Sequence, residues 1–129
     1  MDKSTFLEAA ETGDAETIKA HLNNGADVNT MDEHNRTALL KAAKHGHTDI
    51  VRTLLAHNAD INLRDNRGTS PLYWAVTNSH AEIVELLLSN GADMHISDNR
   101  GWSVLDQAEV SHDIAIMNLL KQRPTAGAV

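Results

Sequence analysis

The sequence repeats itself with a period of 33 residues, and this periodicity constrains the fold more than any other feature. The positions that recur in three successive units are Asp32, Asp65 and Asp98, Leu39, Leu72 and Leu105, and Ala42, Ala75 and Ala108. The same offset relates seven positions between Ala9 and Asn29 to identical residues between Ala42 and Asn62. A unit of this length is one supersecondary structure that buries its apolar face only against its neighbours. The chain is therefore predicted to fold as a stack of units.

Residues 65–97 show what one unit contains. Its first four residues, D-N-R-G, indicate a turn, with Gly68 at a position where a positive φ is easily adopted. Ser70 suits the N-cap of a helix and Pro71 suits its first turn. We expect a second helix from about Ala81 to Ser89, closed by Asn90-Gly91 as a left-handed C-cap. Each unit is thus predicted to be a turn followed by two short helices.

The unit D-N-R-G-T-S-P-L-Y-W-A-V-T-N-S-H-A-E-I-V-E-L-L-L-S-N-G-A-D-M-H at residues 65–95 resembles the ankyrin repeat family. Residues 32–64 are similar, with A-A-K-H-G-H-T-D-I-V in the middle and N-A-D-I-N near the end. The resemblance covers residues 4–123. It implies an all-α fold, an ankyrin repeat solenoid of helix-turn-helix units joined by β-turn or hairpin loops. A content of only four aromatic residues agrees with small, closely packed helices rather than strands.

We predict a single ankyrin repeat domain over residues 1–124, with repeats at about 1–31, 32–64, 65–97 and 98–124. Residues 125–129, which follow Pro124, are expected to form a short flexible tail. Both ends have the character of caps: the first unit lacks the turn, and Glu109 and Lys121 replace apolar residues in the last. We therefore expect four units to make a complete protein, acting as a monomer.

Composition narrows the classes of partner and the compartment. The absence of cysteine excludes disulfides and thiolate zinc sites. No apolar run is long enough for a transmembrane helix, and the N-terminus lacks the pattern of a secretory signal. The net charge of −7 argues against nucleic-acid binding. We expect a cytoplasmic chain with no cofactor, no nucleic-acid partner and no membrane partner.

One cluster has the composition of a metal or catalytic site. The segment H-G-H-T-D, with His45, His47 and Asp49, looks like an H-x-H-x-D metal-ligand cluster. The other histidines are scattered and show no i, i+4 pair backed by a carboxylate. The resemblance implies instead that His47 bridges neighbouring units by hydrogen bonds, and Asp49 suits the first turn of a helix. The sequence contains neither a nucleophile elbow nor a phosphate-binding loop. We predict no enzyme and no metal site; a metal-binding protein or enzyme using these three residues is the alternative.

The resemblance implies a concave face made by the turn tips and by the outward side of each first helix. The residues predicted to bind a partner there are Trp74, Trp102, Arg36, Lys41, Lys44, His45, Arg67 and Arg100. Trp74 and Trp102 lead this set because tryptophan gives a large contact area at low entropic cost. The alternative is that the two tryptophans pack on each other and cover the stack.

Charge is distributed unevenly along the chain. Residues 1–33 contain eight acidic residues and two lysines, for a net charge of −6, whereas residues 34–64 have a net charge of +3. A functional interpretation predicts a protein partner with an acidic segment beside an apolar one. The chain is thus predicted to be a protein–protein interaction module, and the alternative is a structural spacer without a specific partner.

Overall fold

The computed structural model describes residues 3–122, so Pro124 and the predicted tail at 125–129 lie outside the described residues. The helices of the described part are α1 (Lys3–Thr12), α2 (Ala15–Asn23), α3 (Ala38–His45), α4 (Thr48–Ala56), α5 (Pro71–Thr77), α6 (Ala81–Ser89), α7 (Val104–Ser111) and α8 (Ile114–Gln122). The predicted second helix of residues 65–97 is confirmed at both ends. Ser4 lies inside α1 rather than at its N-cap.

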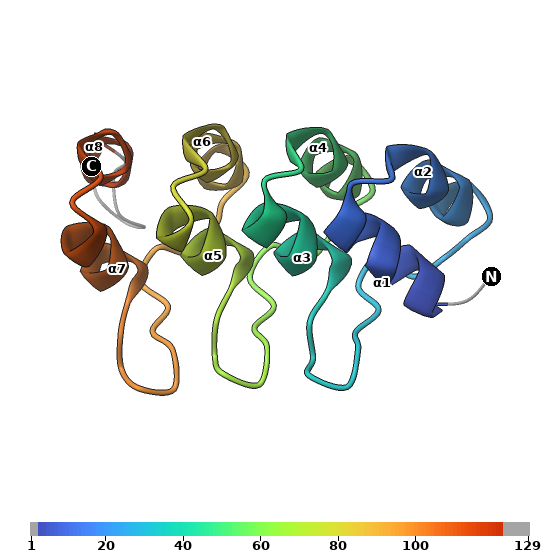
Figure 1. Ribbon diagram of the computed structural model, residues 1–129, viewed down its shortest axis with the longest axis horizontal. Coiled ribbons are helices and arrows are strands. Elements are labelled where there is room, and N and C mark those ends of the chain that lie inside the picture. Colours follow the sequence, from blue (N-terminus) through green and yellow to red (C-terminus); the bar gives the residue numbers. More distant parts are fainter. Residues whose placement is uncertain (1–2, 123–129) are drawn as a thin grey trace.

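The helices pair in chain order and the pairs stack side by side. Figure 1 shows α1, α3, α5 and α7 in one layer and α2, α4, α6 and α8 in a second layer above it. The helices α1, α3, α5 and α7 are called the inner helices, and their layer the inner layer. The loops that precede α3, α5 and α7 project together from the lower side. Isolated antiparallel bridges join Met31 to Thr37 and Ser97 to Ser103, so the first and third of these loops are small hairpins. The predicted all-α repeat solenoid is confirmed.

The start of each inner helix after the first is fixed by a hydroxyl that recurs with the 33-residue period. The side chains of Thr37, Ser70 and Ser103 accept hydrogen bonds from backbone N–H groups three residues ahead, at 3.1–3.2 Å. An N-cap bond satisfies one of the donors that the first helical turn leaves without a partner. The N-cap predicted at Ser70 is therefore confirmed.

The turns need a left-handed residue, and the sequence supplies it in two ways. Gly68 and Gly101 have φ of 79° and 86°. Asn35, at the equivalent position of the preceding unit, has φ of 61°. Asparagine tolerates this region better than other side chains, which explains why it can replace glycine here.

Small residues hold the helix layers together. Ala42, Ala75 and Ala108, one period apart, are each at most 1% exposed. Leu39 and Leu72 fill the adjacent space and are 1% exposed. Only small side chains permit neighbouring inner helices to approach this closely, so the alanine periodicity is a consequence of stacking. Glu109 and Lys121 are exposed, as the sequence predicts.

Two histidines connect successive units. His47 Nε2 donates to the carbonyl of Glu11 at 2.9 Å, and His80 Nε2 donates to the carbonyl of Lys44 at 3.1 Å. Each ring also covers a glycine of the preceding unit, Gly13 or Gly46. The bridging role predicted for His47 is confirmed.

Candidate protein-binding surface

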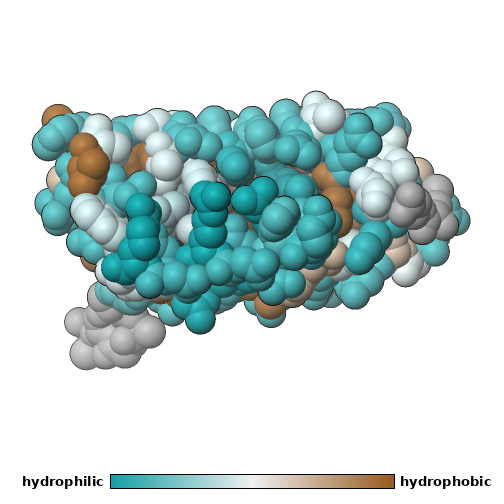
Figure 2. Space-filling view, turned by 60° about the horizontal axis from the view of Figure 1, so that its bottom comes forward, coloured by the Kyte–Doolittle hydropathy of each residue, from teal (hydrophilic) through white to brown (hydrophobic). Residues whose placement is uncertain are grey.

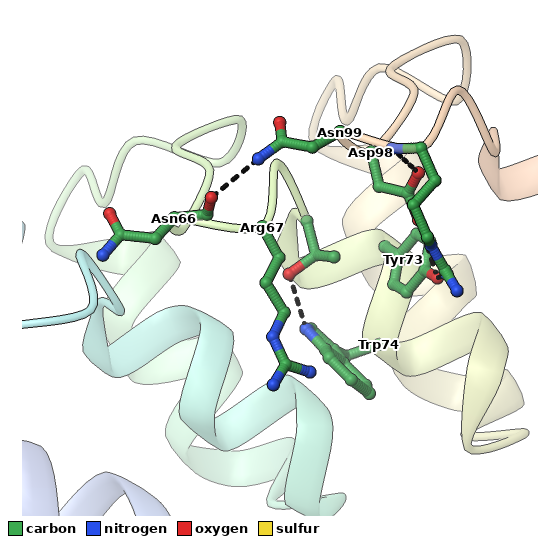
Figure 3. A pocket seen from close by; sticks show the side chains of 8 residues that line it. Asn66, Arg67, Tyr73, Trp74, Asp98 and Asn99 are labelled. Carbon is green, nitrogen blue, oxygen red and sulfur yellow. Dashed lines mark hydrogen bonds and ion pairs between the residues drawn. The ribbon is translucent and has the colours of Figure 1, made fainter.

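A pocket of about 340 Å³ opens between the third and fourth units. It lies where two successive turns meet the inner helix α5, as Figure 3 shows. Its walls are formed by Asn66, Arg67, Thr69, Tyr73, Trp74, Asp98, Asn99 and Arg100. Figure 2, which brings the loops forward, shows a largely hydrophilic surface with small separate hydrophobic spots. The pocket thus places two aromatic rings, those of Tyr73 and Trp74, among polar and charged side chains.

Trp74 is held in a defined orientation on α5. Its indole N–H donates to the hydroxyl of Thr69 at 2.8 Å, and its ring meets that of Tyr73 edge-on, with centroids 5.5 Å apart. Lys44 of the preceding unit places its ammonium 4.5 Å from the centre of the same ring. The side chain is only partly buried. Trp74 therefore combines a fixed position with surface that a partner can cover.

Asp98 organises the opposite wall. Its Oδ1 accepts the backbone N–H groups of Arg100 and Trp102, at 2.9 and 3.0 Å. Its Oδ2 accepts the hydroxyl of Tyr73 at 3.2 Å and Nη2 of Arg100 at 3.0 Å. Burial favours a higher pKa for Asp98, but the N–H of Trp102 and the Arg100 contacts outweigh burial and hold the pKa below its ordinary value. The carboxylate is therefore an internal anchor for the turn.

Hydrogen bonds between successive turns make the rim of the pocket rigid. Asn66 N donates to the carbonyl of His34 at 3.0 Å, and Asn99 N donates to the carbonyl of Arg67 at 2.9 Å. The side-chain amide of Asn99 also donates to the carbonyl of Asn66 at 2.7 Å. A surface tied in this way is formed before any partner arrives.

Of the residues predicted to bind a partner, Trp74, Arg67 and Arg100 line this pocket, and Lys44 contacts Trp74. Arg67 is exposed and extends from its turn alongside Trp74 (Figure 3). No carboxylate within residues 3–122 makes an ion pair with it. Arg100 is 69% exposed at its side chain, although Asp98 and Tyr73 fix its guanidinium.

The other predicted cations are engaged inside the chain. Lys41 Nζ lies 3.1 Å from Asp32 Oδ2, and its side chain is only 12% exposed. Arg36 Nε lies 3.7 Å from Asp65 Oδ2, which is itself buried. These two carboxylates offset the basic charge that the sequence assigns to the second unit.

His45 also faces a residue of its own chain. Its Nε2 lies 3.6 Å from Glu11 Oε1. Burial lowers the pKa of His45, and the neighbouring Glu11 offsets only part of that effect. The imidazole is thus biased towards its neutral form, and the structure gives it no place in the pocket.

Trp102 lies outside the walls of the pocket. It sits in the turn before α7 with 41% of its surface exposed. Its backbone is paired with Asp98, whose N–H donates to the carbonyl of Trp102 at 2.7 Å. Among the residues that the structure describes, Trp102 has no ring contact with Trp74. The alternative in which the tryptophans pack on each other is therefore not what the structure has.

Sequence reasoning did not select Tyr73 or Asp98 as site residues. Tyr73 occupies the position that Leu40 has in the preceding unit. The hydroxyl that this change adds is the feature of the sequence that could have identified Tyr73 as a site residue. Asp98 recurs with the 33-residue period, and such recurrence indicates a structural role rather than a site. The structure shows that one carboxylate can serve the turn and shape the pocket together.

The possible metal cluster does not assemble. His45 and His47 stack with ring centroids 6.3 Å apart, and both contact Glu11, His45 at its carboxylate and His47 at its backbone carbonyl. Asp49 faces solvent and pairs with Arg52 at 3.3 Å. Across residues 3–122, no three His, Cys, Asp or Glu side chains come together in a way that suits a metal ion.

The paired helices, the projecting loops and the pocket define a helical repeat protein with a preformed surface. Comparison with known families matches residues 6–98 to ankyrin repeats in three copies. The chain belongs to the ankyrin repeat family. Ankyrin repeats are generally protein–protein interaction modules and are typically non-catalytic. A comparison with curated proteins gave no significant match.

No helix in the described part of the chain has the length and apolar character needed to cross a bilayer.

Proposed function

We propose that this chain binds a partner protein on its concave face, centred on the pocket beside Trp74. The observation that carries the proposal is the fixed, partly exposed indole of Trp74 in a preformed pocket, with the guanidinium of Arg67 alongside it. Tryptophan and arginine are the residues that most often dominate the energy of protein interfaces.

The mechanism is rigid presentation. The turn tips are joined by backbone hydrogen bonds, and Thr69, Tyr73 and Lys44 hold the indole. A surface that is already ordered loses little conformational entropy when it binds. The free energy gained when a partner covers Trp74 is therefore not used to order the surface. Charge sets the rate and register of association.

The proposal can be tested by affinity capture from a lysate of the native source, read by mass spectrometry. The baits are the wild type, a Trp74→Ala/Trp102→Ala variant and Lys19→Gln, which removes a charge from exposed α2 as a matched control. We expect a protein retained by the wild type and by Lys19→Gln but lost by the double variant. Equal retention by all three baits contradicts the site, and empty lanes favour the spacer alternative.

We further propose that the chain acts as a monomer in the cytoplasm. Sedimentation equilibrium of the purified chain tests the first part, and the location of the endogenous protein by immunofluorescence tests the second.

A further inference from the structure

The structure points to the chemistry of the partner: we propose that the pocket takes an acidic side chain followed or preceded by an apolar one. The carboxylate lies at the rim of Trp74 beside Arg67 and Lys44, and the apolar neighbour covers the indole inside the pocket. This inference rests on the proposed function, because it specifies what the same surface recognises.

Some side-chain cations of the predicted binding surface remain without a carboxylate partner in the part of the chain that the structure describes. Each recurring turn aspartate has its own cation: Asp32 pairs with Lys41, Asp65 with Arg36, and Asp98 with Arg100. Lys44 and Arg67 have no such carboxylate within the described part of the chain. Both lie at Trp74, one over its ring and one alongside it. Of the cations predicted to bind a partner, Lys44 and Arg67 are therefore the two left without a carboxylate among the described residues, and both lie at this one indole.

The hydrogen bonding of the turns favours a carboxylate over a phosphate group as the ligand. Phosphate sites in proteins usually offer several free backbone N–H groups. Here the turn N–H groups are already used: those of Arg67 and Thr69 by Asp65, and those of Arg100 and Trp102 by Asp98. Only side-chain cations remain, and these suit a carboxylate.

Acidic residues on α1 limit the number of acidic residues that the bound segment can contain. Towards the N-terminus the inner layer carries Glu8 and Glu11 on α1, and both are exposed. A tract of acidic residues that extended in this direction meets like charge, which is unfavourable across an interface. The pocket therefore selects one acidic residue with an apolar neighbour rather than a polyacidic segment.

The test is selection of peptides from a displayed library of random heptapeptides with the wild-type chain as bait. We expect the enriched peptides to contain one Asp or Glu adjacent to an apolar residue. Synthetic versions with amidated C-termini should bind equally well, because the carboxylate comes from a side chain. A peptide that needs its free C-terminus overturns the assignment.

A double-mutant cycle then isolates the proposed ion pair. Replacing the peptide Glu by Gln, or Arg67 by Gln, should each weaken binding about tenfold, and the combined change should add little more. Lys19→Gln, the control for net charge, should bind as the wild type does. The side chain of Arg67 is exposed, so Arg67→Gln should keep the wild-type circular dichroism spectrum and Tm.

The outcomes separate this inference from the proposed function. Peptides that require Trp74 but lack an acidic residue, or that bind Arg67→Gln unchanged, overturn the inference and leave the binding surface in place. Peptides that bind Trp74→Ala as tightly as the wild type contradict both. If no peptides are enriched, the inference is overturned but the proposed function is not, because capture of a folded partner tests that function separately. If a phosphoserine peptide binds more tightly than its Glu counterpart, the group that the pocket prefers is a phosphate, and the assignment of a carboxylate is overturned.

Discussion

Lys44 Nζ lies 4.5 Å from the centre of the Trp74 ring, so a cation of the second unit rests on an aromatic residue of the third. A cation at this distance is attracted by the ring, by about 0.5–1 kcal/mol at exposed sites. The contact orients the indole and keeps a positive charge at the rim of the pocket. Recognition in this account depends on two successive repeats acting together rather than on one residue.

Trp74→Ala should weaken partner binding by about 2 kcal/mol or more, because it removes the largest surface that a partner covers. The helical stack should survive, since Trp74 lies outside the fully buried core. Isothermal titration calorimetry measures the first effect and far-UV circular dichroism the second. Loss of the helical signal means that Trp74 is a core residue and contradicts its assignment to the site.

Gly46→Ala should destabilise the stack more than Gly91→Ala does. Both glycines have positive φ, 79° and 91°, so the backbone strain is similar, about 1 kcal/mol. At Gly46 an added Cβ lies 2.8 Å from Cε1 of His80, whereas at Gly91 it meets nothing within 4 Å. Urea unfolding should therefore show an additional loss of about 1 kcal/mol or more for Gly46→Ala. Equal losses mean that the contact between units is not tight.

Asp98→Ala should lower the free energy of unfolding by about 3 kcal/mol, because it leaves the Tyr73 hydroxyl and two turn N–H groups without their acceptor. Asp60→Ala is the control: Asp60 is exposed and its Oδ1 accepts only the N–H of Asn62 at 3.2 Å. The control should lose less than about 1 kcal/mol. Comparable losses in chemical denaturation argue against Asp98 as the anchor of the pocket wall.

Acid should destabilise the fold partly through Asp98. Because its pKa in the folded state lies below the ordinary value of about 4, the ionised carboxylate stabilises the fold above that pH. This contribution is lost as the pH falls below about 4 and through the folded-state pKa. Between pH 5 and 3, Asp98→Asn should therefore show a shallower decline in the free energy of unfolding than the wild type. Parallel curves for the two proteins are inconsistent with this role.

Much of the scaffold could be predicted from the sequence because it rests on local, periodic rules. Gly68, Ser70 and Pro71 act through their own backbone neighbourhood, and their roles follow from residue type and position. The alanine periodicity likewise reports packing between identical units. The N-cap hydroxyls and the alanines recur in three units, so each copy supports the interpretation of the others.

The site was less predictable because charge pairing between units is not visible in residue type. From the sequence alone, Arg36 and Lys41 are expected to be available to a partner. In the structure Asp65 lies within ion-pair distance of Arg36, and Asp32 within ion-pair distance of Lys41. The sequence predicts that Trp102 and Trp74 belong to one binding surface, but the turn that carries Trp102 places it outside the walls of the pocket. Only the three-dimensional register of neighbouring turns distinguishes Arg67, whose charge is left unpaired within residues 3–122.

The fluorescence of Trp74 tests the central claim most directly. The chain has two tryptophans, so a Trp102→Phe variant leaves Trp74 as the only indole. Titration with the captured partner should shift its emission to shorter wavelength or quench it, because binding removes a partly exposed ring from water. Emission that stays constant while calorimetry shows binding would place the partner elsewhere on the molecule and contradict this account.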